Sequence, residues 1–292
     1  MDLTRKMSDF LSLIKFSHTI FALPFALLGF FLGTLDDGVL SPKILLLVIL
    51  AMVFARSAAM AFNRYLDQDI DAENPRTAIR EIPAGVISSQ SALIFILVNV
   101  IAFIITTWFI NPMCFYLSPV ALAVILGYSY TKRFTYLCHF VLGLGLALAP
   151  IGAYLAVTAQ WAVLPILYGV VVLLWVAGFD IIYALQDESF DREHHLQSLP
   201  VQLGRVGALR LGEFLHLVCA IILGYAIYLQ MHTYPEVGSL TIIAGLLFIS
   251  LLMYQHRLVK PTDLSRVNLA FFTTNGVASL IFGGLSILDM FF

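Results

Sequence analysis

Long apolar stretches alternate with short polar breaks along nearly the whole chain. A run of about 20 apolar residues is long enough to cross a bilayer as a helix, and the short alternating strands of a membrane barrel do not fit this pattern. The sequence therefore predicts an all-α polytopic membrane protein with about nine transmembrane helices. They lie near residues 17–35, 43–63, 91–110, 115–131, 138–157, 162–185, 211–230, 238–256 and 267–289.

Basic residues are divided unequally between the two sets of connections that these spans create. One side of the membrane holds only Lys43, and Arg56 lies within a span. Positively charged loops are retained in the cytoplasm. The side that carries most of the basic residues is therefore predicted to be the cytoplasmic face of the cell (inner) membrane, and we expect the chemistry on that side. That side carries 14 of the 16 lysines and arginines: Arg5, Lys6, Lys15, Arg64, Arg76, Arg80, Lys132, Arg133, Arg192, Arg205, Arg210, Arg257, Lys260 and Arg266.

The overall composition agrees with a single membrane domain. The 292 residues are 60% hydrophobic and 12% charged, with a mean hydropathy of +0.93. A soluble domain carries about twice that share of charge, and no polar segment is long enough to form one, so we expect one transmembrane domain over residues 1–292 surrounded by the lipid bilayer. The net charge of −2 and the lack of a basic tail predict no nucleic-acid partner, and no feature indicates an obligate protein partner.

Acidic residues are concentrated in two short windows on the cytoplasmic side, which together hold eight of the 18. The first window follows the second predicted helix and the second follows the sixth. Asn63, Asp67 and Asp71 recur every four residues, which aligns them along one helical face. Offsets of three, seven and eleven residues align a second set in the same way: Asp180, Tyr183, Asp187 and Asp191.

Carboxylates stacked at this spacing repel one another unless a cation lies beside them. Mg²⁺ prefers hard oxygen ligands and shares its coordination shell with substrate phosphates. Two facing columns of acids are therefore candidates to hold Mg²⁺ on one diphosphate. The alternative is that they are solvated charges at helix ends, and we interpret Asp69 and Glu73, which lie off the aligned face, in that way.

Three blocks of sequence resemble the UbiA-type membrane prenyltransferase family. The first runs from Asn63-x3-Asp67-x3-Asp71 through Asn74-Pro75-Arg76-Thr77 to Arg80, Pro83 and Gly85. The second is Asp180-x2-Tyr183-x3-Asp187-x3-Asp191, and the third is Tyr130-Thr-Lys132-Arg133-Phe-Thr135. The chain departs from many members of the family at one position, where Arg64 follows Asn63 in place of an aspartate.

This resemblance implies a fold, a reaction and roles for individual residues. It implies nine helices around a central cavity, and Mg²⁺-dependent transfer of a polyprenyl group from polyprenyl diphosphate to an aromatic acid such as 4-hydroxybenzoate in quinone biosynthesis. Mg²⁺ would be held by Asn63, Asp67, Asp71, Asp187 and Asp191, of which the four aspartates are the catalytic residues. The diphosphate and the acceptor would be bound by Arg56, Asn63, Arg76, Arg80, Tyr130, Lys132, Asp180 and Tyr183.

Arg56 is the one basic residue predicted within a membrane span. It lies seven residues before Asn63, about two turns deeper on the same face. An ionised residue there is costly unless it faces a polar cavity or a partner. The family resemblance implies that Arg56 binds the carboxylate of the aromatic acid, and pairing with Asp180 or another buried acid is the alternative. Lys15 and His18 are further candidates for substrate contact.

Two other classes of protein use acids in a membrane. A CDP-alcohol phosphotransferase needs an Asp-Gly pair that these windows lack. A cation-coupled transporter would carry ionisable residues near mid-membrane in several helices, whereas most acids here lie at one surface. Among aromatic acids, the segment 14–25 most resembles the 4-hydroxybenzoate branch, and relatives that act in menaquinone synthesis by the futalosine route are the alternative. Asp191 and a diphosphate oxygen are the candidates for removing the ring proton.

Overall fold

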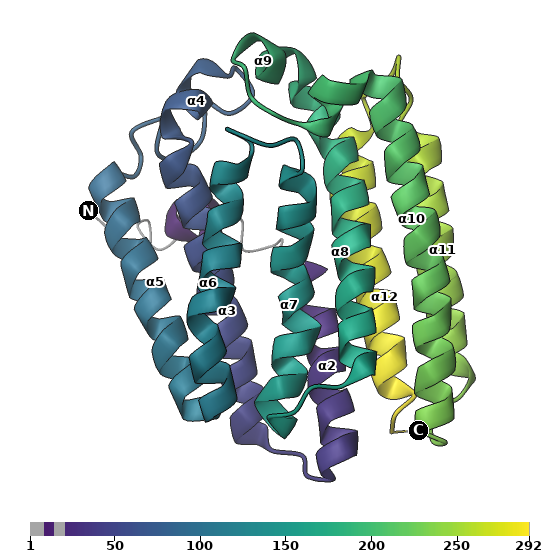
Figure 1. The fold of residues 1–292 in the computed structure, drawn as a ribbon. Helices are drawn as coiled ribbons and strands as arrows, with labels where there is room; N and C mark the ends of the chain where they lie inside the picture. The colour runs from purple at the N-terminus through teal and green to yellow at the C-terminus, as the bar shows by residue number, and fades with distance from the viewer. Residues whose placement is uncertain (1–8, 15–20, 292) are drawn as a thin grey trace.

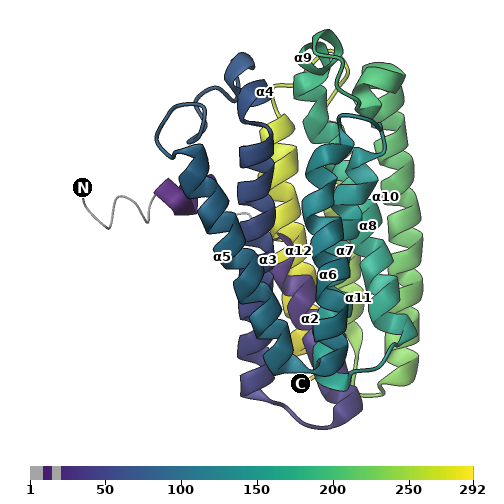
Figure 2. The ribbon, with the colours of Figure 1, turned by 60° about the vertical axis from the view of Figure 1, so that its left-hand side comes forward.

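The computed structural model describes residues 9–14 and 21–291, which form a bundle of long helices running side by side (Figures 1 and 2). No strand occurs within these residues. The long helices are α2 (Leu23–Asp37), α3 (Pro42–Leu66), α5 (Ser89–Ile110), α6 (Pro112–Thr131), α7 (Cys138–Thr158), α8 (Val163–Ala184), α10 (Leu199–Thr233), α11 (Ser239–Leu258) and α12 (Asn275–Leu288), the last preceded by a π-helical turn, η3 (Leu269–Thr274).

Eight helical segments of the described chain are long and apolar enough to cross a membrane. α2 is a ninth long helix, described over 15 residues, and the first predicted span, 17–35, begins outside the described residues. The predicted all-α, multi-pass membrane architecture is confirmed, and the predicted number of about nine spans is approximately right, with eight spans and α2 in the described residues.

Short helices cover one end of the bundle. α4 (Gln68–Glu73) continues from α3, and η2 (Leu185–Asp187) and α9 (Glu188–Glu193) continue from α8. Figure 1 shows α4 and α9 lying beyond the same ends of the long helices, at the top of the view. The two acidic windows of the sequence are thus at one end of the molecule.

Several of the membrane helices begin at side chains that satisfy their free backbone N–H groups. Ser41, Ser88 and Asn111 accept hydrogen bonds from backbone N–H groups three residues later, at the starts of α3, α5 and α6. Such caps define where a helix starts. At α3 and α6 the cap is followed by a proline, which has no backbone N–H group to leave unpaired. Asn111 also donates to the carbonyl oxygens of Leu155 and Ala156, at 2.8 and 3.1 Å, which fixes the start of α6 to the end of α7.

α10 is longer than the sequence predicts. The apolar pattern predicts a span over 211–230, but the helix begins at Leu199, capped by Ser198 and bent at Gly204, whose φ of 67° is non-helical. The segment before residue 211 carries Arg205 and Arg210, so the apolar window identified only the part of the helix that can enter lipid. The prediction of this boundary was wrong because hydropathy indicates which residues can lie in lipid and does not indicate where the helix begins.

One half of the bundle, which we call the packed half, is filled by large aromatic side chains from α2, α8, α11 and α12. Trp175 is fully buried at its centre, with the rings of Phe25 and Phe248 at centroid distances of 5.5 and 5.4 Å. Its indole N–H donates to Asn275 at 2.8 Å. Asn275 in turn donates to carbonyl oxygens of the π-helical turn, one of them that of Phe271. The Trp175–Asn275 hydrogen bond therefore joins α8 to the start of α12 within the aromatic core.

The other half, which we call the hollow half, encloses a cavity of about 330 Å³ between α2, α3, α5, α6 and α7. The expected cavity is present, and it lies within one half of the bundle, where its wall is mainly aliphatic and includes several alanine and glycine residues. Small side chains of this wall include Ala26, Ala51, Ala55, Ala121, Ala149 and Gly152.

The end of the bundle opposite α4 and α9 is closed by a different set of polar contacts. Asp36, at the end of α2, accepts hydrogen bonds from the hydroxyl groups of Tyr154 and Tyr234, at 2.6 and 2.8 Å. Asp289 accepts from the N–H groups of Gly238 and Thr241, at 2.9 and 2.8 Å. These bonds join α2, α7, α10, α11 and α12 at that end, so the two acids there have structural partners already.

Candidate active site

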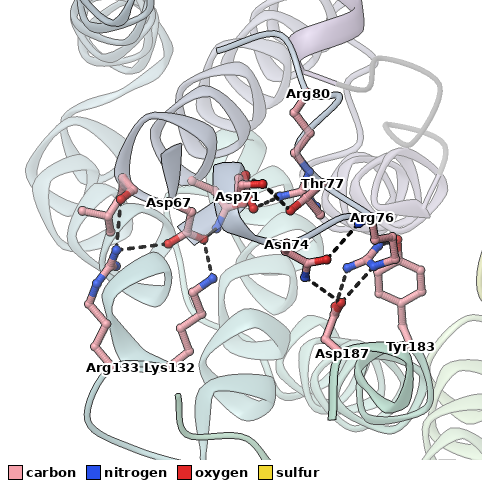
Figure 3. A network of polar contacts seen from close by, with 12 residues as sticks. Asp67, Asp71, Asn74, Arg76, Thr77, Arg80, Lys132, Arg133, Tyr183 and Asp187 are labelled. Atoms are coloured by element: carbon pink, nitrogen blue, oxygen red, sulfur yellow. Dashed lines mark hydrogen bonds and ion pairs between the residues drawn. The ribbon is translucent and has the colours of Figure 1, made fainter. Parts of the chain in front are cut away.

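The two acidic motifs meet at the end of the bundle covered by α4 and α9. The loop after α4 reaches across to η2, where Asn74 Nδ2 donates to Asp187 Oδ1 at 3.2 Å and Arg76 Nε donates to the same oxygen at 2.9 Å. Figure 3 shows these side chains converging, with Lys132 and Arg133 approaching from the α6–α7 connection. The structure thus brings the two motifs and the third block of sequence into one site.

Asp67 lies deepest among the acids of the first motif and is only 2% exposed. Its Oδ2 accepts a hydrogen bond from Asn63 at 3.2 Å and lies 2.6 Å from Lys132 Nζ. Its Oδ1 is buried without a hydrogen bond in the described part of the chain, although Arg133 Nη2 lies 3.3 Å away. Arg133 also donates to the carbonyl oxygen of Leu66 at 3.0 Å. Arg133 is therefore part of the site, in addition to any role in orienting the chain in the membrane.

Asp71 forms a two-oxygen ion pair with Arg80. Nη1 of Arg80 lies 2.6 Å from both carboxylate oxygens, and Asp71 is 4% exposed. Thr77 Oγ1 donates to the Asp71 carbonyl oxygen at 3.1 Å, which folds the intervening loop back onto α4. The four-residue spacing of Arg76 and Arg80 predicts that both face one anion, but in this structure Arg80 holds Asp71 and Arg76 holds Asp187.

Arg76 joins the first motif to the second. Besides its bonds to Asp187, its Nη1 donates to the Tyr183 hydroxyl at 3.1 Å, and its guanidinium carbon lies 5.4 Å from the centre of the Tyr183 ring. Burial acts to lower the pKa of Arg76, but the hydrogen bonds to Asp187 and the negative charge of Asp187 outweigh this effect. The pKa of Arg76 is therefore raised, and Arg76 remains positively charged.

Asp180, the first acid of the second motif, pairs with a residue that we did not predict. His139 Nδ1 lies 2.7 Å from Asp180 Oδ2, and His139 Nε2 accepts from the N–H of Leu199 at 3.3 Å. Since Nε2 is the acceptor, Nδ1 is the nitrogen that donates to Asp180. Among the described residues, the ion-pair partner of Asp180 is therefore His139 and not Arg56.

Asp191 lies half-buried at α9, close to the acids and bases of the site. It is within electrostatic range of Asp187 and Lys132. Burial and the negative charge of Asp187 raise its pKa to about 6, which is the ordinary direction for a carboxyl group removed from water beside another acid. Asp191 can therefore take up a proton more readily than an exposed aspartate.

Within the described residues, no group of three or more acidic, histidine or cysteine side chains is arranged to hold a metal ion. The expected repulsion between acids is instead offset by basic side chains, namely Lys132, Arg133, Arg80 and Arg76. The donor set nevertheless fits a hard divalent cation, because it consists of carboxylate oxygens and includes the unbonded Asp67 Oδ1. If a metal ion and an anion bound together, the acids would contact the metal ion and the basic side chains would contact the anion, in place of the present ion pairs.

The cavity of the hollow half is lined by a single charged residue of the described chain, Arg56. Its buried Nε has no hydrogen-bond partner in the described residues. Tyr128 of α6 also lines the cavity, whereas Tyr130 is 46% exposed and packs against Phe62. The tyrosine that shares the cavity with Arg56 is therefore Tyr128, and Tyr130 lies nearer the surface.

Tyr128 and His139 are two residues of this region that the sequence prediction did not name. Ala121, Val124 and Tyr128 follow one another at intervals of three and four residues, which places them on one face of α6, and all three line the cavity. That periodicity is the signal that could have identified Tyr128. For His139 the sequence carries no comparable signal, because its partners Asp180 and Leu199 are far away along the chain.

The remaining predicted residues are placed as follows. Asp69 is exposed, and Glu73 is largely exposed and lies 3.1 Å from His194 Nε2, as suits surface charges. Lys15 and His18 lie outside the described residues.

Comparison with known proteins gives a consistent result over most of the chain. The family model described as "UbiA prenyltransferase family" matches residues 22–277. The chain is 31% identical over 250 residues to a 4-hydroxybenzoate octaprenyltransferase from Aliivibrio salmonicida, covering 86% of each chain. It is 32% identical to a protein of the same name from Tolumonas auensis, covering 82% of each.

Solved structures share the fold. The structure of a UbiA homolog from Aeropyrum pernix K1 superposes with a TM-score of 0.81 at 32% identity, covering 94% of this chain and 98% of that one. A UbiA homolog from Archaeoglobus fulgidus, bound to DMAPP and Mg²⁺, superposes with a TM-score of 0.72 at 19% identity, covering 97% and 99%.

Proposed function

Because the chain belongs to the UbiA prenyltransferase family and is a membrane prenyltransferase, we propose that it transfers a polyprenyl group from polyprenyl diphosphate to an aromatic acid such as 4-hydroxybenzoate. The reaction uses Mg²⁺ and takes place at the cytoplasmic end of the bundle. The observation that carries the proposal is the convergence of both acidic motifs and four basic side chains beside an apolar cavity.

The diphosphate is bound by the basic residues that form ion pairs with the acids in this structure. Lys132, Arg76 and Arg80 each lie on a carboxylate in the ligand-free site, and each can turn to a phosphate oxygen instead. Arginine and lysine suit this role because both remain charged and donate strong hydrogen bonds to phosphate. The residues then free to hold Mg²⁺, which supplies charge neutralisation for the departing diphosphate, are Asn63, Asp67, Asp71, Asp187 and Asp191.

The acceptor lies at the boundary between the acidic site and the cavity. Arg56 faces this space with an unbonded Nε, and a carboxylate is the anion of an aromatic acid that would satisfy it. Tyr128 lines the same wall. The polyprenyl tail is apolar, and a cavity with a mostly apolar wall gives it space away from water.

The reaction breaks the bond between the first prenyl carbon and the diphosphate oxygen. The bonding electrons leave with the diphosphate, where the basic side chains stabilise the developing negative charge. The allylic cation that remains is attacked by the electron-rich ring of the acceptor, which forms the new carbon–carbon bond. The ring proton is then removed by Asp191 or by a diphosphate oxygen. Tyr183, whose ring already lies beside the Arg76 guanidinium, offers an aromatic face to a cation in this region.

Names and folds of relatives support the same assignment. The curated relatives act, by their names, on 4-hydroxybenzoate. The Archaeoglobus fulgidus homolog holds DMAPP and Mg²⁺, so the fold accommodates a prenyl diphosphate together with a divalent ion. The basic residues of the loops support the cytoplasmic placement of the site.

The test is prenyl transfer by the purified protein in detergent or lipid nanodiscs. A radiolabelled polyprenyl diphosphate is supplied with a panel of aromatic acids, with Mg²⁺ or with excess EDTA. We expect labelled product with 4-hydroxybenzoate or a related acid and none with EDTA. Asp67→Asn should lower turnover at least about 100-fold, whereas Asp69→Asn, an exposed acid on the same short stretch of chain, should change it less than about twofold.

Transfer that continues undiminished in EDTA, or in Asp67→Asn, would contradict the proposed role of the acids. Lack of transfer to every aromatic acid, with transfer to another acceptor, would contradict the proposed substrate class.

A further inference from the structure

Arg64 is a buried cation with two guanidinium nitrogens that lack partners in the described part of the chain. It lies in the last turn of α3, next to Asn63, and is 6% exposed. Its Nε and Nη1 atoms are buried and make no hydrogen bond to any described residue. A buried charge that lacks a partner is costly, so this position is not explained by the stability of the ligand-free protein.

The acids near Arg64 are already bonded elsewhere. Asp71 and Glu81 lie within electrostatic range of Arg64. Both oxygens of Asp71 are held by Arg80, however, and Glu81 accepts a hydrogen bond from Ser12. Arg80 is itself within electrostatic range of Arg64 and repels it. The region therefore holds two guanidinium groups, of which only Arg80 is hydrogen-bonded to a carboxylate.

The position of Arg64 on the helix separates it from Arg56. The two residues are eight positions apart, which places them about 12 Å apart along the helix axis and about 80° apart around it. Both arginines lie within electrostatic range of Tyr128, but Arg56 lines the cavity whereas Arg64 is also within range of the Asp71–Arg80 pair. The two arginines are thus suited to two different anions.

We propose that Arg64 binds a phosphoryl group of the diphosphate, next to Arg80, and so forms an additional anion subsite of the donor. This inference rests on the proposed function. A phosphoryl group carries negative charge and several acceptor oxygens, which would provide the unbonded Nε and Nη1 with partners. Arg64 is therefore a binding residue that is costly in the ligand-free protein and favourable in the complex.

The proposal predicts effects of opposite sign on stability and on binding. Arg64→Met keeps the length of the apolar side chain and removes the buried charge. In the ligand-free protein we expect its Tm to rise by at least about 2 °C. With inorganic pyrophosphate and Mg²⁺, we expect the Kd measured by isothermal titration calorimetry to rise at least about tenfold, as for the loss of a charged hydrogen bond, with a smaller pyrophosphate-induced rise in Tm. Arg64→Lys, which keeps the charge, should recover part of the affinity.

Arg257→Met is the matched control. Arg257 is an exposed arginine in the last turn of α11. Its replacement should leave the pyrophosphate Kd within about twofold, and the Tm within about 1 °C, of the original values. Arg64→Gln provides a second variant if Arg64→Met does not fold, with the same expected loss of affinity.

An unchanged pyrophosphate Kd in the folded Arg64→Met or Arg64→Gln protein would overturn the inference. If the Tm also falls in that case, the role of Arg64 is structural. Prenyl transfer by the original protein is measured in parallel. Its absence counts against the proposed function, whereas normal transfer together with unchanged pyrophosphate binding in the variants counts only against the role of Arg64.

Discussion

The packed half and the hollow half of the bundle have similarly apolar sequences but differ in the size of the side chains they turn inward. Trp175, Tyr168, Phe25, Phe248 and Phe282 are fully buried in the packed half. The cavity wall of the hollow half consists mainly of aliphatic residues, with alanine or glycine at 11 of its 31 positions. Tight packing stabilises a fold, whereas an apolar cavity with one polar group is typical of a ligand site. The comparison indicates that one half supplies stability and that the other, in the proposed function, supplies space for substrate.

α7 takes part in both halves, and two of its glycines show the difference. A Cβ atom on Gly143 would lie 2.5 Å from the carbonyl oxygen of Leu173 in α8. A Cβ atom on Gly152 would have no heavy atom within 4 Å, because this residue faces the cavity. Glycine thus allows a close helix–helix contact at one end of α7 and leaves open space at the other.

The largest expected effect comes from removing volume from the packed half. Trp175→Ala should lower the free energy of unfolding by about 3–5 kcal/mol, because it leaves a cavity and deprives Asn275 of its hydrogen-bond donor. Thermal unfolding in detergent measures this, with Trp175→Phe as the control that keeps most of the ring contacts. A loss below about 1 kcal/mol in Trp175→Ala, well under the usual cost of such a cavity, would mean that the two halves do not differ in their contribution to stability.

A smaller effect, on binding alone, is expected in the hollow half. Arg56→Gln should raise the KM for the aromatic acid about 10- to 100-fold, as expected for the loss of a hydrogen-bonded charge. The KM for polyprenyl diphosphate should change less than about threefold, and the Tm should not fall. Steady-state kinetics with each substrate varied in turn checks this, and equal changes in the two KM values would argue against a contact with the carboxylate.

The smallest effects compare one substitution at two positions of α7. Gly143→Ala should lower the free energy of unfolding by about 1–3 kcal/mol, because the new methyl group meets the backbone of α8. Gly152→Ala should leave it unchanged or raise it by up to about 1 kcal/mol, because alanine favours the helix. Thermal unfolding of both proteins side by side is the measurement. Equal losses would show that the wall of the cavity is packed as tightly as the helix interface.

Much of the fold was predictable because the membrane imposes a simple rule on the sequence. Each span must be long and apolar, and the basic residues mark one side. The start of α10 was missed because the helix continues past the apolar window into a segment with Arg205 and Arg210. The division into two halves was not predictable, since it depends on which residues face one another and not on hydropathy.

The acidic site was predictable in its members but not in its pairing. Spacing from α3 into α4 and from α8 through η2 into α9 identified the acids, and the family match leaves the transporter alternative without support. Spacing could not show that Lys132 holds Asp67 or that His139 holds Asp180, because these partners come from other helices. The place of Arg133 was missed for the same reason, since it depends on a contact across the bundle with the end of α3.

The ion pairs of the ligand-free site have a consequence for how charge is carried there. Asp67, Asp71 and Asp187 have counterions that are attached to the chain itself. These pairs therefore keep the site close to neutral without a mobile salt ion, and in the proposed function ligand entry is an exchange of counterions rather than an accumulation of charge. Loss of any one of these bases would leave an acid to recruit a mobile ion, so its effect should extend beyond its own contact with substrate.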